Sequence, residues 1–195
     1  MLDIISINEK NLNYLHSYEI EYKNKDGENR IWELVSRKDL QRLKYEILEN
    51  KSFSDGTMIF ATDLSKEKVC LIKEYRVSAG RYVYGLPAGL LENGEDIKTS
   101  AIREFKEETG LDLEYISHSK SRYTSIGITN EKVDIVYGYF SGKIDYSFQE
   151  ADEDIEVIIA DKNKVIEILE NEEVGIRSAL LLEYFFNLNK FMSNK

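Results

Sequence analysis

The sequence predicts an α+β fold in which strands dominate the middle of the chain and helices close it. Three observations predict this fold: polar–apolar alternation near the N-terminus, short apolar runs between polar turns in the middle, and helical spacing of apolar residues near the C-terminus. The chain has 195 residues, of which 42% are hydrophobic and 11% aromatic, enough for a packed core. We expect a β-rich N-terminal extension at residues 1–45 and a main domain at residues 46–195.

The N-terminal extension is expected to hold a β-hairpin that a helix follows. The segments "SYEIEYK" and "RIWELVS" alternate as strands do, and "NKDG" between them favours a turn. The next segment is "DLQRLKYEILEN", at residues 39–50. Its apolar residues recur at helical spacing, which predicts a helix.

The main domain is expected to begin with two strands, "GTMIFATD" and "KVCLIKEY", around the polar turn "LSKE". Two later strands are predicted at "KVDIVYGYF" and "DIEVIIA". A helix should start with Asp161 as its N-cap, and another should follow at "IRSALLLEYFFNLNK", residues 176–190. Cys70, the single cysteine, lies in an apolar run, so we expect it to be buried and reduced.

The charge of the chain limits its partners. The formal net charge is −10 and the pI is about 4.9, which disfavours broad electrostatic binding to nucleic acid. The sequence shows neither a signal-peptide pattern nor an apolar run of membrane length. We therefore expect a cytoplasmic protein that binds neither nucleic acid nor a membrane.

The stretch "GLLENGEDIKTSAIREFKEETGL", residues 89–111, carries six carboxylates. A helix is predicted from about Asp96 to Thr109. At about 100° per residue, Glu104 and Glu108 fall within roughly 40° of each other and Glu107 lies about 60° to the other side. The apolar stripe of this helix is predicted at Ile97, Ala101, Ile102 and Phe105.

Two interpretations of these carboxylates stay open from the residues alone. A run of like charge is often a solvated face, which should point away from the core. Glu104 and Glu108, however, are predicted at the edge of the apolar stripe, where charge is costly to desolvate. Hard oxygen ligands at such spacing suit Mg²⁺ or Mn²⁺.

The full spacing of the stretch resembles the Nudix box, Gly-x5-Glu-x7-Arg-Glu-U-x-Glu-Glu-x-Gly-U, in which U is a bulky apolar residue. All nine positions fit, from Gly89 to Leu111. The resemblance implies an α/β/α sandwich with a mixed β-sheet, and hydrolysis of a nucleoside diphosphate linked to another group. It implies that Glu104, Glu107 and Glu108 hold two or three Mg²⁺ ions per site, with Mn²⁺ as an alternative.

Further roles follow only from the resemblance. Arg103 matches the arginine that orients the glutamates by ion pairing, and Glu107 takes part in catalysis as well as metal binding. The backbone carbonyl of Ala88 matches a further metal ligand. The surrounding segment "LIKEYRVSAGRYVYGLPAGLLENGE" is similar to the ADP-ribose pyrophosphatase branch of the family. In that branch the arginine at the position of Arg76 contacts the diphosphate, a task that suits its bidentate fork.

The N-terminal segment "KDGENRIWELVSR" also resembles that branch, in which a β-rich extension is exchanged across a homodimer. The resemblance implies that Trp32 and Arg37 reach the adenine that the partner subunit binds. Tyr14 is a candidate for the other stacking face. The substrate would then be a nucleotide sugar, with ADP-ribose cleaved to AMP and ribose 5-phosphate as the first candidate.

The catalytic base is expected in the acidic loop "EADEDIEV", which resembles the loop that supplies it in this branch. Glu153 is the first candidate, and Glu150 and Glu131 are alternatives. Two positions depart from the branch: Ile126 stands where a proline is usual, and Gly85 where a glutamate is common. Both departures leave other nucleoside diphosphate sugars open.

Other functions also stay open. A different Nudix substrate is one alternative, such as a dinucleoside polyphosphate, coenzyme A or a modified nucleoside triphosphate, although the N-terminal extension argues against a minimal triphosphate-cleaving enzyme. A non-catalytic domain that binds a nucleotide sugar and regulates a partner is another. The intact motif argues against that regulator.

Overall fold

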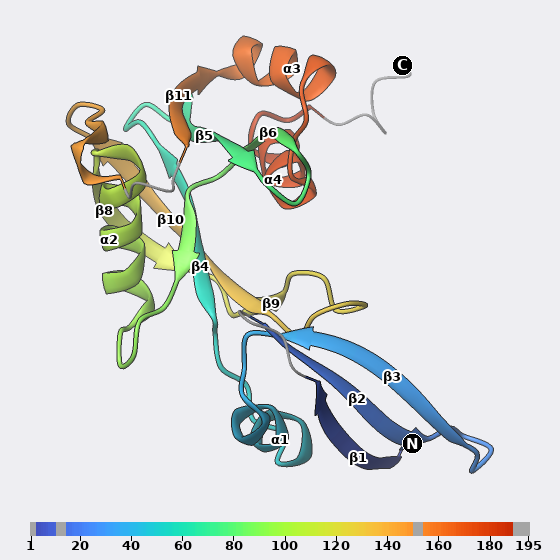
Figure 1. Ribbon diagram of the computed structural model, residues 1–195. Helices are drawn as coiled ribbons and strands as arrows, with labels where there is room; N and C mark the ends of the chain where they lie inside the picture. Colours follow the sequence, from blue (N-terminus) through green and yellow to red (C-terminus); the bar gives the residue numbers. More distant parts are fainter. Residues whose placement is uncertain (1–2, 11–14, 150–153, 189–195) are drawn as a thin grey trace. The chain divides into compact units, whose positions relative to one another are not determined.

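The computed structural model describes residues 3–10, 15–149 and 154–188 (Figure 1). The chain forms two compact units. The first comprises residues 1–55 and 120–133, and the second comprises residues 56–119 and 134–195. The boundary at residue 45 that the sequence suggests for the extension stays a prediction.

The first unit contains an antiparallel sheet in the order β1-β2-β3 and one helix. Its elements are β1 (Asp3–Lys10), β2 (His16–Lys23), β3 (Asn29–Ser36), α1 (Leu40–Leu48) and the short β9 (Arg122–Tyr123). The predicted hairpin is β2–β3, and the predicted helix is α1. Leu43 of α1 packs against the buried side chains of Tyr18, Ile20 and Leu34 in the sheet.

Buried charge fastens the segment 120–133 to the N-terminal elements of the first unit. The ammonium group of Lys38 is almost fully buried, 2.7 Å from a carboxylate oxygen of Glu46 and 3.1 Å from one of Asp55. It also donates a hydrogen bond to the carbonyl oxygen of Asn130. Because a buried ion must keep its partners, these contacts hold the segment in place.

The second unit is built on a sheet whose main strands follow the order β11-β5-β4-β10-β8. Two further strands attach to it: β6 pairs with β5, and β7 pairs with β4. The strands are β4 (Gly56–Thr62), β5 (Lys68–Arg76), β6 (Arg81–Gly85), β7 (Ala88–Leu90), β8 (Asp112–His118), β10 (Lys132–Ser141) and β11 (Ile155–Asp161). The four strands expected in the main domain are β4, β5, β10 and β11.

Helices cover both faces of this sheet (Figure 1). They are α2 (Ile97–Thr109), α3 (Lys162–Asn171) and α4 (Ile176–Phe185), with the short 3-10 helix η1 at Tyr146–Phe148. Alternate residues of β4 face opposite ways. Ile59 packs in the core beneath α2, and Phe60 packs in the core beneath α3 and α4. The second unit is therefore an α/β/α sandwich.

Several predicted details hold and two do not. Asp161 caps α3 by accepting a hydrogen bond from the Lys164 amide, and Cys70 is fully buried. Helix α4 ends at Phe185, before the predicted residue 190, and Asn187 follows with a left-handed φ of 52°. Ile102 of α2 is 38% exposed, so its place in the predicted apolar stripe was wrong.

Two further features are the burial of the Cys70 thiol and the character of the helices. The apolar surroundings raise the pKa of the Cys70 thiol, which keeps it protonated and unreactive. None of the helices in the described ranges combines the length and the apolar character that a membrane span requires.

Candidate active site

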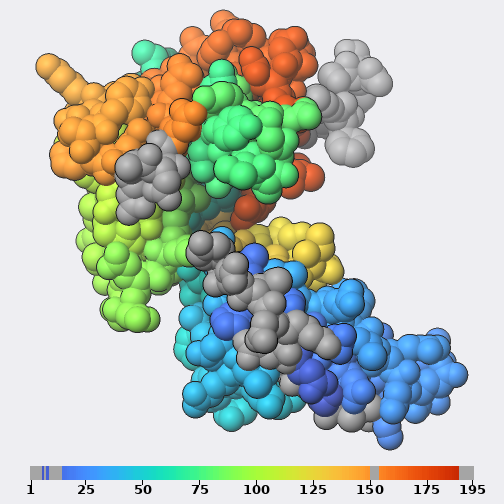
Figure 2. Space-filling view, in the orientation of Figure 1, coloured from blue at the N-terminus to red at the C-terminus, as the bar shows by residue number. Residues whose placement is uncertain are grey.

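Local sequence signals fix helix α2, which carries the clustered glutamates. Asp96 lies in extended backbone before the helix and accepts a hydrogen bond of 2.9 Å from the Thr99 amide, which caps the N-terminus. Gly110 ends the helix with a φ of 70°, a conformation that glycine adopts without strain. A Cβ at Gly110 would overlap backbone atoms of Asp145. The outer face of α2, yellow-green in Figure 2, lies at the surface of this unit.

Arg103 is the centre of the carboxylate cluster. Its Nε and Nη2 atoms donate to both oxygens of Glu95, at 3.0 and 2.9 Å. Its Nη1 atom lies 2.9 Å from an oxygen of Glu104 and 2.9 Å from one of Glu107. Hydrogen bonding to Glu95 raises the pKa of Arg103 and lowers the pKa of Glu95. The guanidinium therefore stays charged and favours the ionised form of the Glu95 carboxylate.

Strand β7 lies directly against these carboxylates. Glu108 is only 5% exposed and accepts a hydrogen bond of 3.1 Å from the Ala88 amide. A Cβ on Gly89 would overlap the carboxylate of Glu104. Arg103 also donates to the carbonyl oxygen of Leu90 at 3.2 Å. The short strand and the helix thus hold one acidic cluster between them, and the glycine makes room for it.

The cluster fits divalent cations by its donors and its charge. The cluster contains four carboxylates. Arg103 contacts those of Glu95, Glu104 and Glu107 with its single positive charge, and Glu108 accepts from the Ala88 amide. Carboxylate oxygens are the ligands that Mg²⁺ and Mn²⁺ prefer. As they stand, no three His, Cys, Asp or Glu side chains among the described residues converge as a metal-binding group. A cation bound to Glu104 or Glu107 would compete with Arg103, which contacts both carboxylates.

The predicted diphosphate-binding residue, Arg76, lies at the end of β5. It belongs to the same face of that strand as Cys70, which packs on the α2 side of the sheet. Its guanidinium is exposed and lies 2.6 Å from a carboxylate oxygen of Glu74. The predicted role of Arg76 stays a prediction.

The residues predicted to reach the nucleotide base belong to the first unit. Trp32 lies on β3 opposite Ile20, and its side chain is 48% exposed. Arg37 follows that strand, and its Nε atom lies 3.5 Å from an oxygen of Glu131. Tyr14 lies outside the described residues. The structure therefore gives positions for Trp32 and Arg37 without testing their roles.

The loop predicted to hold the catalytic base is described only at its ends. Glu150 and Glu153 lie outside the described residues. Before the loop, Gln149 donates a hydrogen bond of 2.8 Å to the carbonyl oxygen of Glu108. After it, the carbonyl of Asp154 accepts from the Tyr75 amide at 3.2 Å. Gln149, the last described residue before the loop, is thereby hydrogen-bonded to the helix that carries the glutamates.

The third base candidate, Glu131, has defined partners in the first unit. Besides Arg37, it contacts Thr124, whose hydroxyl donates a hydrogen bond of 2.8 Å to it. No sequence pattern indicated the hydrogen bond of Gln149 to Glu108, nor the hydrogen bond that the Tyr82 hydroxyl donates to Asp154. That bond raises the pKa of Tyr82. Both contacts join segments far apart in the sequence, so no local pattern marks them.

The two departures from the branch pattern lie in different units. Ile126 belongs to the first unit and is 62% exposed. Gly85 ends β6, where an added Cβ would meet only the Ser178 hydroxyl oxygen at 3.9 Å. Neither position is closed to a larger side chain by its immediate surroundings.

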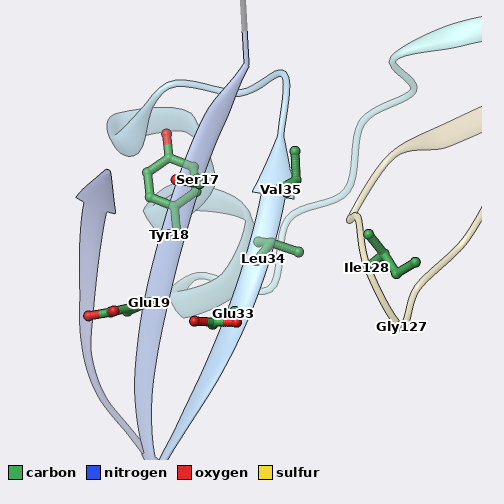
Figure 3. Close-up of a pocket in the computed structure, with 8 residues that line it drawn as sticks. All are labelled: Ser17, Tyr18, Glu19, Glu33, Leu34, Val35, Gly127 and Ile128. Carbon is green, nitrogen blue, oxygen red and sulfur yellow. The ribbon is translucent and has the colours of Figure 1, made fainter. Parts of the chain in front are cut away.

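A hollow of about 410 Å³ lies in the first unit between β2, β3 and the segment at Gly127 and Ile128. Figure 3 shows Glu19 and Glu33 on its β-strands, where the two residues pair across the sheet. None of the residues that line it is a predicted site residue. The acidic cluster on α2, and not this hollow, therefore identifies the candidate active site.

Known proteins resemble the chain over much of its length. A family model described as the NUDIX domain matches residues 52–173. The chain is 31% identical over 119 residues to an ADP-ribose pyrophosphatase of Saccharomyces cerevisiae, covering 59% of this chain and 48% of that protein. It is 29% identical over 120 residues to an ADP-ribose pyrophosphatase of Bacillus subtilis, covering 60% of this chain and 64% of that protein.

A solved structure described as an ADP compounds hydrolase has the same fold. It superimposes with a TM-score of 0.67 over 97% of this chain and 96% of its own length. Its sequence identity is 20%, so the likeness concerns the fold alone. Together with the family model, it confirms the α+β sandwich that the sequence predicts.

Proposed function

Because the chain belongs to the Nudix family and is related to the ADP-ribose pyrophosphatases, we propose that it hydrolyses the diphosphate bond of a nucleoside diphosphate sugar. ADP-ribose is the first candidate, and its products would be AMP and ribose 5-phosphate. The observation that carries the proposal is the acidic cluster on α2, in which Arg103 contacts Glu95, Glu104 and Glu107. The family and the relatives make the chain a Nudix pyrophosphatase by class.

The acidic cluster would bind two or three Mg²⁺ or Mn²⁺ ions through Glu104, Glu107, Glu108 and the Ala88 carbonyl. Divalent cations there would neutralise the diphosphate and stabilise the negative charge that builds at phosphorus. The chain's own part is orientation. Arg103 holds the carboxylates near one another, and the Ala88 amide fixes the buried head of Glu108.

Other residues would hold the substrate and move the proton. Arg76 would leave Glu74 and clamp the diphosphate, and Trp32 and Arg37 would contact the base from the partner subunit of a homodimer. Glu153 would accept a proton from the attacking water, because a carboxylate near the reacting phosphorus is suited to act as a general base.

A second substrate class has a specific observation in its favour. Ile126 and Gly85 replace residues that are usual in enzymes acting on ADP-ribose, and both positions have room for larger side chains. A nucleoside diphosphate sugar with a different sugar or base is therefore the alternative substrate.

Release of phosphomonoester products from a set of nucleotide sugars, with and without Mg²⁺, tests the proposal. Glu108→Gln keeps the shape of the side chain and removes its charge, so the turnover number should fall about 100-fold or more. Glu170→Gln, on an exposed position of α3, is the matched control and should retain full activity. Near-normal activity of Glu108→Gln at limiting Mg²⁺ would contradict the metal assignment.

The identity of the catalytic base is tested in the same assay by changing Glu153, Glu150 and Glu131 separately to glutamine. A base acts on the water and not on the sugar, so Glu153→Gln should lower kcat with little change in KM. The same pattern for Glu150 or Glu131 would place the base there. If none of the three shows it, the chemistry needs no side-chain base.

A further inference from the structure

Thr57 presents a buried hydroxyl group without a partner. It lies on β4 and is only 1% exposed. Within the part of the chain that the structure describes, its Oγ1 atom has no hydrogen-bond partner. A buried hydroxyl that makes no hydrogen bond destabilises a fold, and valine would fill the same space without that penalty. The threonine therefore calls for an explanation that packing does not give.

Thr57 lies across the strand pair from the space that the Glu104 carboxylate fills. Thr57 is directly opposite Gly89 in the antiparallel pair of β4 and β7, so both point to the same face of the sheet. In such pairs the Cβ positions are about 4.5–5.5 Å apart. The Glu104 carboxylate fills the space that a Cβ of Gly89 would take. Thr57 is therefore a cross-strand neighbour of the Glu104 carboxylate, which occupies the space next to Gly89.

A second observation places Thr57 on the face of the acidic cluster. Ile59, two residues further along β4, packs in the core beneath α2. Since side chains two apart on a strand share a face, Thr57 points toward α2 as well. Its hydroxyl and the glutamates of α2 therefore lie on the same side of the sheet.

We propose that Thr57 is a positioning residue whose hydroxyl donates a hydrogen bond to Glu104 when that carboxylate turns from Arg103 to bind a divalent cation. The inference rests on the proposed function. A carboxylate that gives one oxygen to a cation keeps the other for a donor that fixes its orientation. Arg103 contacts Glu104 with a positive charge that competes with the cation. A hydroxyl group carries no charge, so it orients the carboxylate without competing with the cation.

The test measures cation binding directly. Binding of Mn²⁺ to the full chain without substrate is followed by calorimetry or electron paramagnetic resonance, and thermal unfolding is followed without metal. Thr57→Val should weaken Mn²⁺ binding about 10-fold, while the metal-free protein melts at the same temperature or higher. Thr57→Ser, which keeps the hydroxyl, should retain most of the affinity. Thr62→Val, on the opposite face of β4, is the matched control and should bind Mn²⁺ normally.

The outcomes separate this inference from the proposed function. If Thr57→Val binds Mn²⁺ as the unchanged chain does and Glu108→Gln does not, the positioning role is wrong and the metal site stands. If the unchanged chain itself binds no Mn²⁺, both are wrong. Thr57→Ala provides a second hydroxyl-free variant in case the valine variant fails to fold. Weak Mn²⁺ binding by both Thr57→Ser and Thr57→Val would assign the effect to shape and overturn the role of the hydroxyl.

Discussion

Gly89 is the residue on which the arrangement of the carboxylates depends most directly. Its missing side chain leaves the space that the Glu104 carboxylate fills. Gly89→Ala should therefore displace that carboxylate. We expect Mg²⁺-dependent hydrolysis to fall about 100-fold, because small displacements at a reacting centre have effects of that size. The stability loss should be about 1–3 kcal/mol, as for other overpacked sites.

The control for this change is Gly175→Ala, where an added Cβ would meet only the Tyr84 carbonyl oxygen at 3.9 Å. Steady-state kinetics and thermal unfolding of both variants make the comparison. If Gly89→Ala were as active as Gly175→Ala, the position of Glu104 would be irrelevant to catalysis, and its assignment as a metal ligand would be wrong.

Most residues of the carboxylate cluster were predicted from the sequence, but their contacts were not. The spacing of the motif identified Glu104, Glu107 and Glu108 together with Arg103, because these residues lie within about one turn of a single helix. The same motif contains Glu95 but does not reveal its two hydrogen bonds to Arg103. Such contacts depend on how a loop folds back onto the helix, which local spacing does not determine.

Among the elements, the C-terminal end of α2 requires a glycine at position 110 for two separate reasons. The residue has a left-handed φ of 70°, and an added Cβ would overlap the backbone of Asp145. Gly80 has a similar φ of 65° and no atom within 4 Å of an added Cβ. Gly80→Ala should therefore cost about 1–2 kcal/mol from backbone strain alone. Gly110→Ala should cost about 3 kcal/mol or more, because overlap adds to the strain.

Chemical denaturation of the two variants measures this difference. Equal losses of stability would mean that the segment at Asp145 yields without cost and that the closure of α2 is less tightly packed than its contacts indicate. The same segment leads through η1 to Gln149, whose side chain donates to the backbone carbonyl oxygen of Glu108 in α2. A shift there would therefore reach the carboxylate cluster.

Elements with a strong internal pattern were predicted, and elements defined by their neighbours were not. The hairpin β2–β3 and the cap of α3 follow from alternation and from one aspartate. Strand β7 has three residues and exists through its pairing with β4. Strand β8 buries only Leu113 fully, so it lacks the alternation that marks a half-buried strand.

For the chain as a whole, the family predicted from the sequence is confirmed by the family model, and the similarity to two ADP-ribose pyrophosphatases agrees with the predicted branch and enzyme class. The motif made this prediction strong, because fixed spacing over residues 89–111 identifies a family more firmly than any fold pattern. The substrate, the metal ions, the cytoplasmic location and the homodimer stay predictions. They depend on ligands and partners that a single chain does not contain.

The homodimer is the prediction that concerns the whole molecule most. The N-terminal sheet carries exposed apolar side chains at neighbouring positions, with Ile31 60% and Trp32 48% exposed. A single small sheet cannot bury both of its faces. Exchange across a two-fold axis would cover this surface and bring Trp32 and Arg37 to the site of the partner. Each active site would then need both chains.

Mixing two impaired chains tests this shared site. Trp32→Ala should weaken substrate binding, and Glu108→Gln should lower metal-dependent turnover about 100-fold or more. In a mixed dimer with shared sites, one site collects both defects and the other has neither, so activity above that of both parents should return after subunit exchange. A monomer in light scattering, or a verified mixed dimer without recovery, would contradict the shared site. Trp32 would then pack only within its own chain, and residues of a single chain would have to bind the nucleotide base.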